Sequence, residues 1–249
     1  MIVKPKVRGF ICTTAHPVGC EAVVKNEIEY VKSRRAEDNG FKPKKVLVIG
    51  SSMGYGLASR IALAFSAGAA TLGVMFDRPA SGNKTGTSGW YNTRAFEKFA
   101  QADGLYAKTV NGDAYSDECK KEVIDLIKSD LGKVDAVIYS LAAPRRTVGD
   151  VTYSSVLKTT GEPYTNKTID LRNNTVSEVT IEPATEEEIA ATVKVMGGED
   201  WAAWIDALKA ADAIEDNAVT VAYSYIGPEI THPMYFEGSI GRAKAHLFQ

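Results

Sequence analysis

Tyr235 and Lys244 are the pair of side chains best suited to acid–base chemistry in this 249-residue chain. A phenol has an unperturbed pKa near 10 and a neighbouring ammonium stabilises its ionised form, so the pair suits a general acid or an oxyanion donor. In one helix, residues nine positions apart point to opposite faces, because each residue turns the helix by about 100°. Tyr235 must therefore lie on a loop before the helix of Lys244, with Ser239 as the expected N-cap. The residues alone leave open an aromatic packing residue and a surface lysine.

A glycine-rich turn is the second candidate for chemistry. Residues 46–49 are apolar and predict a buried strand, after which Gly50, Gly54 and Gly56 lead into an apolar helical pattern. Glycines permit unusual dihedrals and let a pyrophosphate approach the backbone N–H groups. The spacing Gly-x3-Gly-x-Gly differs from the common dinucleotide fingerprint. A tight connection that binds nothing therefore stays open beside a dinucleotide site.

Asp77 follows a second apolar strand, expected over residues 69–76. An acidic side chain at this place, about 20 residues after the turn, accepts hydrogen bonds from an adenosine ribose. Its charge also repels a 2′-phosphate, which favours NADH over NADPH. The alternative is that Asp77 is a solvated loop residue.

The elements that must position these residues alternate between strand and helix. Further strands are expected at 105–110, 135–139 and 218–223, which predicts a Rossmann-type, doubly wound parallel sheet in an α/β fold. A short N-terminal strand or hairpin within 1–16 and an inserted β-hairpin within 151–183 complete one domain over 1–249. A loop is expected at 78–92. The expected helices cover residues 20–37, 93–102, 117–130 and 200–211, and another starts at Thr185.

Composition limits the classes of function. With 45% hydrophobic residues the chain can bury a substantial core, and a net charge of -2 gives no overall attraction to nucleic acid or anionic membranes. Its three cysteines form no CxxC pair, so neither a disulfide framework nor a metal site is expected. The first residues carry charges and a proline, so they make neither a signal peptide nor a membrane span. We expect a soluble, cytoplasmic protein.

Long motifs follow one another along nearly the whole chain: MIVKPKVRGFICTTAHPVGC, GSSMGYG, GTSGWYN, YSLAAP, VMGGEDW, AYSYIGPE and the Tyr-x8-Lys pair. In sequence and order they resemble the FabV-type enoyl-acyl-carrier-protein reductases and trans-2-enoyl-CoA reductases, a divergent branch of the short-chain dehydrogenase/reductase fold.

The resemblance implies a set of site residues. Tyr235 is the implied catalytic acid, Lys244 binds the nicotinamide ribose and tunes Tyr235, and Tyr225 contacts the thioester. The family often has glutamate where this chain has Asp77, and the shorter side chain keeps the charge. The implied NADH contacts are Gly50, Ser51, Ser52, Met53, Gly54 and Tyr55 at the phosphates, Phe76 and Asp77 at the adenosine end, Asp113 and Ala114 at the adenine, and Leu141 and Ala142 near the nicotinamide.

The activity implied by the resemblance is NADH-dependent reduction of the trans-2 double bond of an enoyl-CoA or enoyl-acyl-carrier-protein, a step of fatty acid biosynthesis. The expected partner is the acyl carrier protein or CoA thioester, and a monomer is expected at full length. Family members continue beyond the lysine helix, so we expect a C-terminally truncated chain that lacks the last core strands. Two alternatives stay open: a short-chain ketone reductase, in which the lysine should follow the tyrosine by four residues, and a non-catalytic NADH-binding fragment.

Overall fold

The structure, a computed structural model, describes residues 2–8, 11–34, 40, 42–225 and 227–249. The chain divides into two compact units, which are residues 1–140 with 205–223, and residues 141–204 with 224–249. The expectation of one domain over 1–249 stays a prediction. No helix in the described part of the chain is long and apolar enough to cross a membrane.

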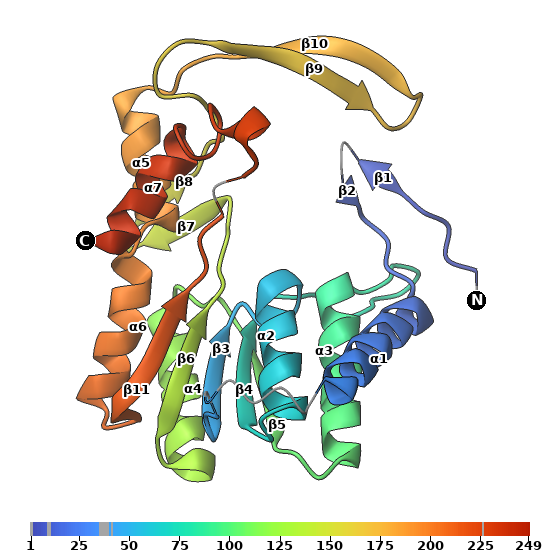
Figure 1. The fold of residues 1–249 in the computed structure, drawn as a ribbon, viewed down its shortest axis with the longest axis vertical. Coiled ribbons are helices and arrows are strands. Elements are labelled where there is room, and N and C mark those ends of the chain that lie inside the picture. The colour runs from blue at the N-terminus through green and yellow to red at the C-terminus, as the bar shows by residue number, and fades with distance from the viewer. Residues whose placement is uncertain (1, 9–10, 35–39, 41, 226) are drawn as a thin grey trace. The chain divides into compact units, whose positions relative to one another are not determined.

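A five-stranded parallel sheet forms the centre of the first unit (Figure 1). The strand order reverses at β3: the chain proceeds to β4 and β5 on one side and to β6 and β11 on the other. This topology confirms the predicted doubly wound sheet. In such sheets ligands bind beyond the carboxyl ends of the strands, where the strand order reverses. The strands are β3 Lys45–Ile49, β4 Ala70–Met75, β5 Ala107–Asn111, β6 Val134–Tyr139 and β11 Ile214–Ala222.

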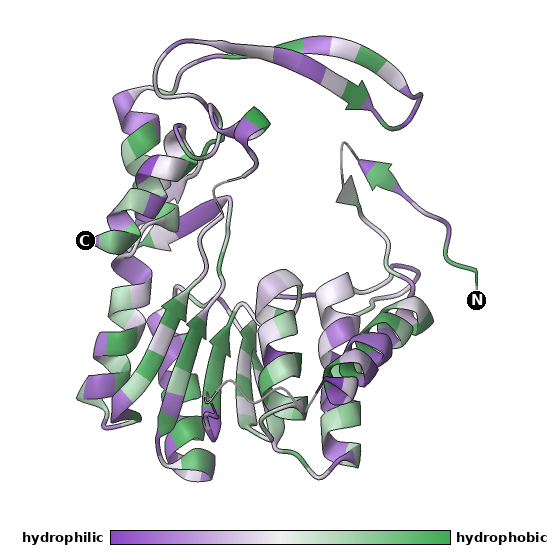
Figure 2. Cartoon of the chain, in the orientation of Figure 1, coloured by the Kyte–Doolittle hydropathy of each residue, from purple (hydrophilic) through white to green (hydrophobic). Residues whose placement is uncertain are grey.

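Apolar strands explain why this sheet lies inside the unit. Residues 46–49 of β3 are fully buried, as expected for a parallel strand covered on both faces. Figure 2 shows the same strands as mainly hydrophobic. The helices of this unit are α1 Pro17–Ser33, α2 Gly54–Phe65, α3 Ser88–Ala102 and α4 Asp117–Leu126, which continues as a π-helical turn Ile127–Leu131.

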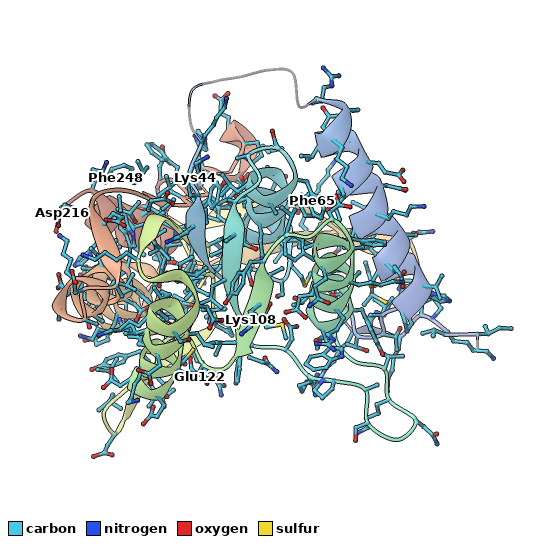
Figure 3. The ribbon with its side chains drawn as sticks, turned by 90° about the horizontal axis from the view of Figure 1, so that it is seen from below. Lys44, Phe65, Lys108, Glu122, Asp216 and Phe248 are labelled. Carbon is cyan, nitrogen blue, oxygen red and sulfur yellow. The ribbon has the colours of Figure 1, made fainter. Side chains whose placement is uncertain are left out.

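Apolar packing joins three of these helices. Phe65, labelled in Figure 3 at the end of α2, meets Phe96 of α3 edge to face, with ring centroids 5.9 Å apart. Val24 and Ile28 of α1 join the same buried cluster. Apolar residues at helical spacing on three helices thus form one core.

The predicted loop at 78–92 is too long. Helix α3 begins at Ser88, not near Thr93, so its first turn contains a glycine and a tryptophan. Gly89 is buried, and a Cβ there would lie 2.4 Å from a carboxylate oxygen of Asp77. The Asn92 amide donates a hydrogen bond to the Ser52 carbonyl at 3.3 Å. Tertiary contacts therefore outweigh the low helix propensity of the Ser-Gly start.

The N-terminal strands β1 Val7–Arg8 and β2 Ile11–Cys12 pair antiparallel, which confirms the predicted hairpin.

The described residues of the second unit form two hairpins, of which the sequence predicted one. Strands β9 Tyr164–Asp170 and β10 Thr175–Ile181 pair antiparallel around Asn174, whose φ is +55°. Strands β7 Arg145–Val148 and β8 Val151–Ser154 form the other hairpin, which was not predicted.

Helices α5 Glu186–Met196 and α7 Ser239–Ala245 belong to the second unit, while α6 Glu199–Ala210 spans the boundary between the units. Thr185 and Glu188 form a capping box at the start of α5, close to the predicted start at Thr185. Short 3-10 turns lie at Glu229–Thr231 and His246–Phe248.

Gly56→Ala tests the tight connection between β3 and α2. A Cβ at this residue would lie 2.0 Å from the Gly50 carbonyl oxygen, a backbone atom that cannot yield without moving the turn. We expect the free energy of unfolding, measured by urea titration, to fall by about 1–3 kcal/mol. Gly161→Ala is the matched control, because its Cβ would have no heavy atom of any described residue within 4 Å apart from its own residue and its chain neighbours. Equal stabilities of the two variants would contradict the close approach.

Candidate functional site

The glycine-rich turn is fixed to the neighbouring strand by its backbone. The N–H groups of Gly50 and Ser51 both donate to the Val74 carbonyl, at 3.0 and 2.9 Å. Gly50 and Gly54 have φ values of +80° and +54°, a region that favours glycine. Among the described residues no side chain caps α2 at Met53. The first N–H groups of α2 therefore remain available to an anion, as a pyrophosphate requires.

Arg60 of α2 joins this helix to β4 and β5 inside the unit, and it was not among the residues predicted from the sequence. Its guanidinium is fully buried. It donates to the Thr109 hydroxyl at 2.8 Å and to the carbonyl of Lys108, a residue labelled in Figure 3, at 2.6 Å. The guanidinium carbon lies 4.4 Å from the centroid of the Phe96 ring. Burial lowers the pKa of Arg60 to about 10, against the opposing effects of Glu97 and Tyr106.

Gly73 makes room for both Arg60 and Ser51. A Cβ at Gly73 would lie 2.4 Å from Ser51 Oγ and 2.5 Å from Arg60 Nη1. The Ser51 hydroxyl donates to the Val74 carbonyl at 3.1 Å and is buried. A signal for Arg60 was present in the sequence, because it is the one charged residue in the apolar segment GYGLASRIALAF.

Asp77 lies beside the turn, as its place after the second strand predicts. A Cβ at Gly89 would contact both an Asp77 carboxylate oxygen and Ser52 Oγ, so these two predicted cofactor contacts lie close together. The Thr87 hydroxyl donates to Asp77 Oδ1 at 2.7 Å. Asn111 accepts from the Asp77 N–H and donates to its carbonyl, both at 2.9 Å. The carboxylate is therefore held in place, and no described residue donates to its second oxygen.

The remaining contacts predicted in the first unit lie at the ends of β4 and β5. Phe76 is 81% exposed, so its ring can lie against a flat ligand. Asp113 accepts from the Tyr115 N–H at 3.0 Å, while Ala114 is buried. The Gly112 N–H donates to the Met75 carbonyl at 2.9 Å, which fixes the two strand ends side by side.

Tyr225, Tyr235 and Lys244 lie in the second unit, together with Leu141 and Ala142. The rings of Tyr225 and Tyr235 meet edge to face with centroids 5.0 Å apart. Leu141 is half-buried and Ala142 is exposed. The structure thus brings the two tyrosines together.

Tyr235 lies in the loop before α7, outside the helix of Lys244, as the spacing predicts. A Cβ at Gly241 would lie 2.7 Å from the Tyr235 carbonyl oxygen and 1.9 Å from that of Phe236, so the loop folds back closely on the helix. The predicted N-cap is wrong, because Gly238 caps α7 and Ser239 is its first residue. The Ser239 hydroxyl instead donates to the Val156 carbonyl at 2.5 Å.

Lys244 is 6% exposed and lines a cavity of about 920 Å³ within the second unit. Burial lowers the pKa of its ammonium. It forms no ion pair with any described residue, and no hydrogen bond joins it to the Tyr235 hydroxyl within that part of the chain. Thr159 lines the same cavity, and its buried hydroxyl has no described hydrogen-bond partner. The lining of the cavity therefore includes the Lys244 ammonium as a positive charge.

Two family models match the chain. The one described as "Trans-2-enoyl-CoA reductase catalytic region" matches residues 84–249, and "NAD(P)H binding domain of trans-2-enoyl-CoA reductase" matches residues 2–82.

Three known proteins show the extent of the similarity. The chain is 61% identical to a trans-2-enoyl-CoA reductase [NADH] of Ruminiclostridium cellulolyticum and 58% identical to an enoyl-[acyl-carrier-protein] reductase [NADH] of Serratia proteamaculans. Each match covers 99% of this chain and 62% of the relative. The crystal structure of Treponema denticola trans-2-enoyl-CoA reductase in complex with NAD matches with a TM-score of 0.95 at 50% identity, over 99% of this chain and 63% of that one. The chain therefore belongs to the trans-2-enoyl-CoA reductase family.

Proposed function

We propose that this chain carries the NADH-binding and catalytic residues of a reductase that saturates the trans-2 double bond of an enoyl thioester. The observation that carries this proposal is the joint placement of the open α2 N-terminus and the Asp77 carboxylate at the carboxyl edge of one parallel sheet. The relatives from Ruminiclostridium and Serratia, a trans-2-enoyl-CoA reductase [NADH] and an enoyl-[acyl-carrier-protein] reductase [NADH], support NADH as the reductant and an acyl-CoA or acyl-carrier-protein thioester as the substrate.

The residues of the turn fit a dinucleotide. Gly54 has a positive φ and no side chain, so a pyrophosphate can reach the backbone N–H groups at the start of α2. The second oxygen of Asp77, to which no described residue donates, can accept from a ribose hydroxyl, and the charge of the carboxylate disfavours a 2′-phosphate. NADH, when bound, supplies the hydride for the β-carbon of the substrate.

Tyr235 is the proposed acid. Reduction at the β-carbon places negative charge on the thioester oxygen, and a phenol donates a hydrogen bond to such an oxygen. Tyr225, whose ring contacts that of Tyr235, is proposed to contact the thioester on one side. Lys244 is proposed to bind the nicotinamide ribose and to favour ionisation of Tyr235 through its positive charge.

The proposal extends to the setting of the reaction. We place it in fatty acid metabolism in the cytoplasm, with enoyl-CoA or enoyl-acyl-carrier-protein as the substrate and a monomer as the state of the whole protein.

The activity test is NADH oxidation by the 249-residue chain with crotonyl-CoA. Turnover is the expected result. Reduction of a ketone but not of crotonyl-CoA would instead favour a short-chain ketone reductase. NADH binding without turnover of either substrate would favour a non-catalytic binding module.

Tyr235→Phe is expected to lower kcat by at least about 100-fold, because it removes only the hydroxyl that donates to the thioester oxygen. NADH affinity, measured by fluorescence titration, should change by less than about twofold. Phe236→Leu, at an exposed neighbouring ring, is the control for disturbance of the loop. Near-normal kcat in Tyr235→Phe would remove this residue from the proposed role.

Asp77→Ser is expected to raise the ratio of kcat/KM with NADPH to that with NADH by at least about tenfold, because the variant lacks the charge that repels a 2′-phosphate. Asp150→Ser removes an exposed aspartate at the β7–β8 turn and serves as the charge-matched control. An unchanged ratio in Asp77→Ser would contradict the assignment of this carboxylate to the ribose.

Lys244→Met is expected to raise the free energy of unfolding at pH 7, because it removes a buried ammonium that has no described ion-pair partner. Burial lowers the pKa of Lys244 in the folded chain below its value in the unfolded chain. At pH values between these two pKa values the unfolded chain binds more protons, so the stability of the wild type rises with pH. The advantage of the variant should therefore shrink between pH 7 and about pH 10. Urea unfolding at both pH values measures this, and a less stable variant at pH 7 would show that Lys244 is not under an electrostatic cost.

A further inference from the structure

A second group of basic side chains surrounds a hollow of about 740 Å³ in the first unit, outside the turn and the Asp77 site. Four cations line it: Lys4 and Lys6 from the N-terminal segment, and Arg78 and Lys84 from the loop after β4. No acidic side chain of the described residues lines it, whereas the whole chain has a net charge of -2. We call it the basic hollow.

The two walls of the basic hollow are held by hydrogen bonds. In the N-terminal wall, the Thr13 N–H donates to the Lys6 carbonyl at 2.8 Å, and the Thr14 hydroxyl donates to the Lys4 carbonyl at 3.2 Å. A further bond joins this wall to the other, because the Ala15 N–H donates to the Thr85 hydroxyl at 3.3 Å. These bonds to the backbone thus fix the walls and leave the charged ends of the side chains available.

Hydrogen bonds also hold the second wall, which is the loop after β4. Ser81 and Lys84 exchange backbone hydrogen bonds of 3.1 and 3.0 Å, which forms a tight turn. Arg78 is tied through its backbone N–H to the Thr87 hydroxyl at 3.2 Å. Since Thr87 also donates to Asp77, the basic hollow adjoins the proposed adenosine end of the cofactor site.

The cations of the basic hollow have no ion-pair partner among the described residues. Elsewhere exposed lysines commonly do: Lys32 lies 2.5 Å from Asp103, and Lys121 lies 2.6 Å from Asp125. Four like charges around one hollow repel one another, and a bound anion relieves that repulsion. The side chains of Ser81 and Asn83 in the lining add neutral hydrogen-bond donors.

We propose that the basic hollow binds the phosphate groups of coenzyme A, the carrier end of the thioester substrate. This proposal rests on the enoyl thioester reductase function proposed above. Coenzyme A carries a diphosphate and a 3′-phosphate, several negative charges that match the four cations. The proposed place of the NADH diphosphate is at the start of α2, so the basic hollow is available to a second phosphate-bearing ligand.

The test compares two double variants of equal charge change. Lys6→Gln with Lys84→Gln removes one cation from each wall and keeps the backbone hydrogen bonds. Lys25→Gln with Lys121→Gln removes two exposed lysines on α1 and α4 and is the control. Steady-state kinetics use crotonyl-CoA and crotonyl-N-acetylcysteamine, a thioester with the same acyl group and no phosphate.

The first double variant is expected to raise the KM for crotonyl-CoA by about tenfold, because two charge-assisted phosphate contacts are lost. Its kcat, its KM for NADH and its kcat/KM for crotonyl-N-acetylcysteamine should match those of the control. An unchanged KM for crotonyl-CoA would overturn the proposal, and so would an equal loss with both thioesters.

Further measurements distinguish coenzyme A from other ligands that carry phosphate or acidic groups. A weakened affinity for NADPH alone would assign the basic hollow to a 2′-phosphate. A raised KM for crotonyl-acyl-carrier-protein with no change for crotonyl-CoA would assign it to an acidic protein surface. Either result overturns the coenzyme A assignment.

Calorimetric titration with free coenzyme A needs no turnover. If the chain reduces no thioester but binds coenzyme A, and the Lys6→Gln/Lys84→Gln variant loses that binding, the proposed function fails while the assignment of the basic hollow stands. If coenzyme A binds the wild type and this variant equally, the assignment fails whatever the activity.

Discussion

The close approach of α2 to the end of β3 is the constraint on which the cofactor site depends. Gly56 packs against the Gly50 carbonyl at a distance that excludes any side chain, and Ser140 at the end of β6 lies beside the same position. This contact starts the helix directly at the reversal point of the sheet. The N–H groups at the start of α2 consequently point toward the edge where parallel strands place their ligands.

Two buried cations, Arg60 and Lys244, differ in whether hydrogen-bond partners compensate their burial. Arg60 donates to Thr71, Thr109 and the Lys108 carbonyl, and its guanidinium carbon lies over the Phe96 ring. These contacts join α2 to β4 and β5. Lys244 has no comparable partners among the described residues and lines a cavity. A group that is buried without partners weakens the fold, which is typical of residues kept for binding or catalysis.

Much of the fold followed from local patterns. Apolar runs predicted the five parallel strands, and Thr185 marked the start of α5, because these signals act within a few residues. The start of α3 and the cap of α7 were missed, since Gly89 and Ser239 owe their places to distant Asp77 and Val156. The β7–β8 hairpin was also missed, since its strands are only four residues long.

The candidate site shows the same division. The glycine spacing and the place of Asp77 after a strand predicted the candidate dinucleotide site. The separation of Tyr235 from the helix of Lys244 followed from helical geometry. The side chains that hold Asp77 could not be predicted from the sequence. Thr87 and Asn111 have no distinguishing pattern there, and only the fold brings them to Asp77. The roles of Tyr225, Tyr235 and Lys244 stay predictions.

A crystal structure of this chain with NADH is the most direct test of the central claim, which is that the turn after β3 and Asp77 form one dinucleotide site. We expect the diphosphate on the N–H groups at the start of α2 and a ribose hydroxyl within hydrogen-bond distance of the Asp77 carboxylate. A dinucleotide bound elsewhere, or an adenosine ribose that does not touch Asp77, would contradict this claim.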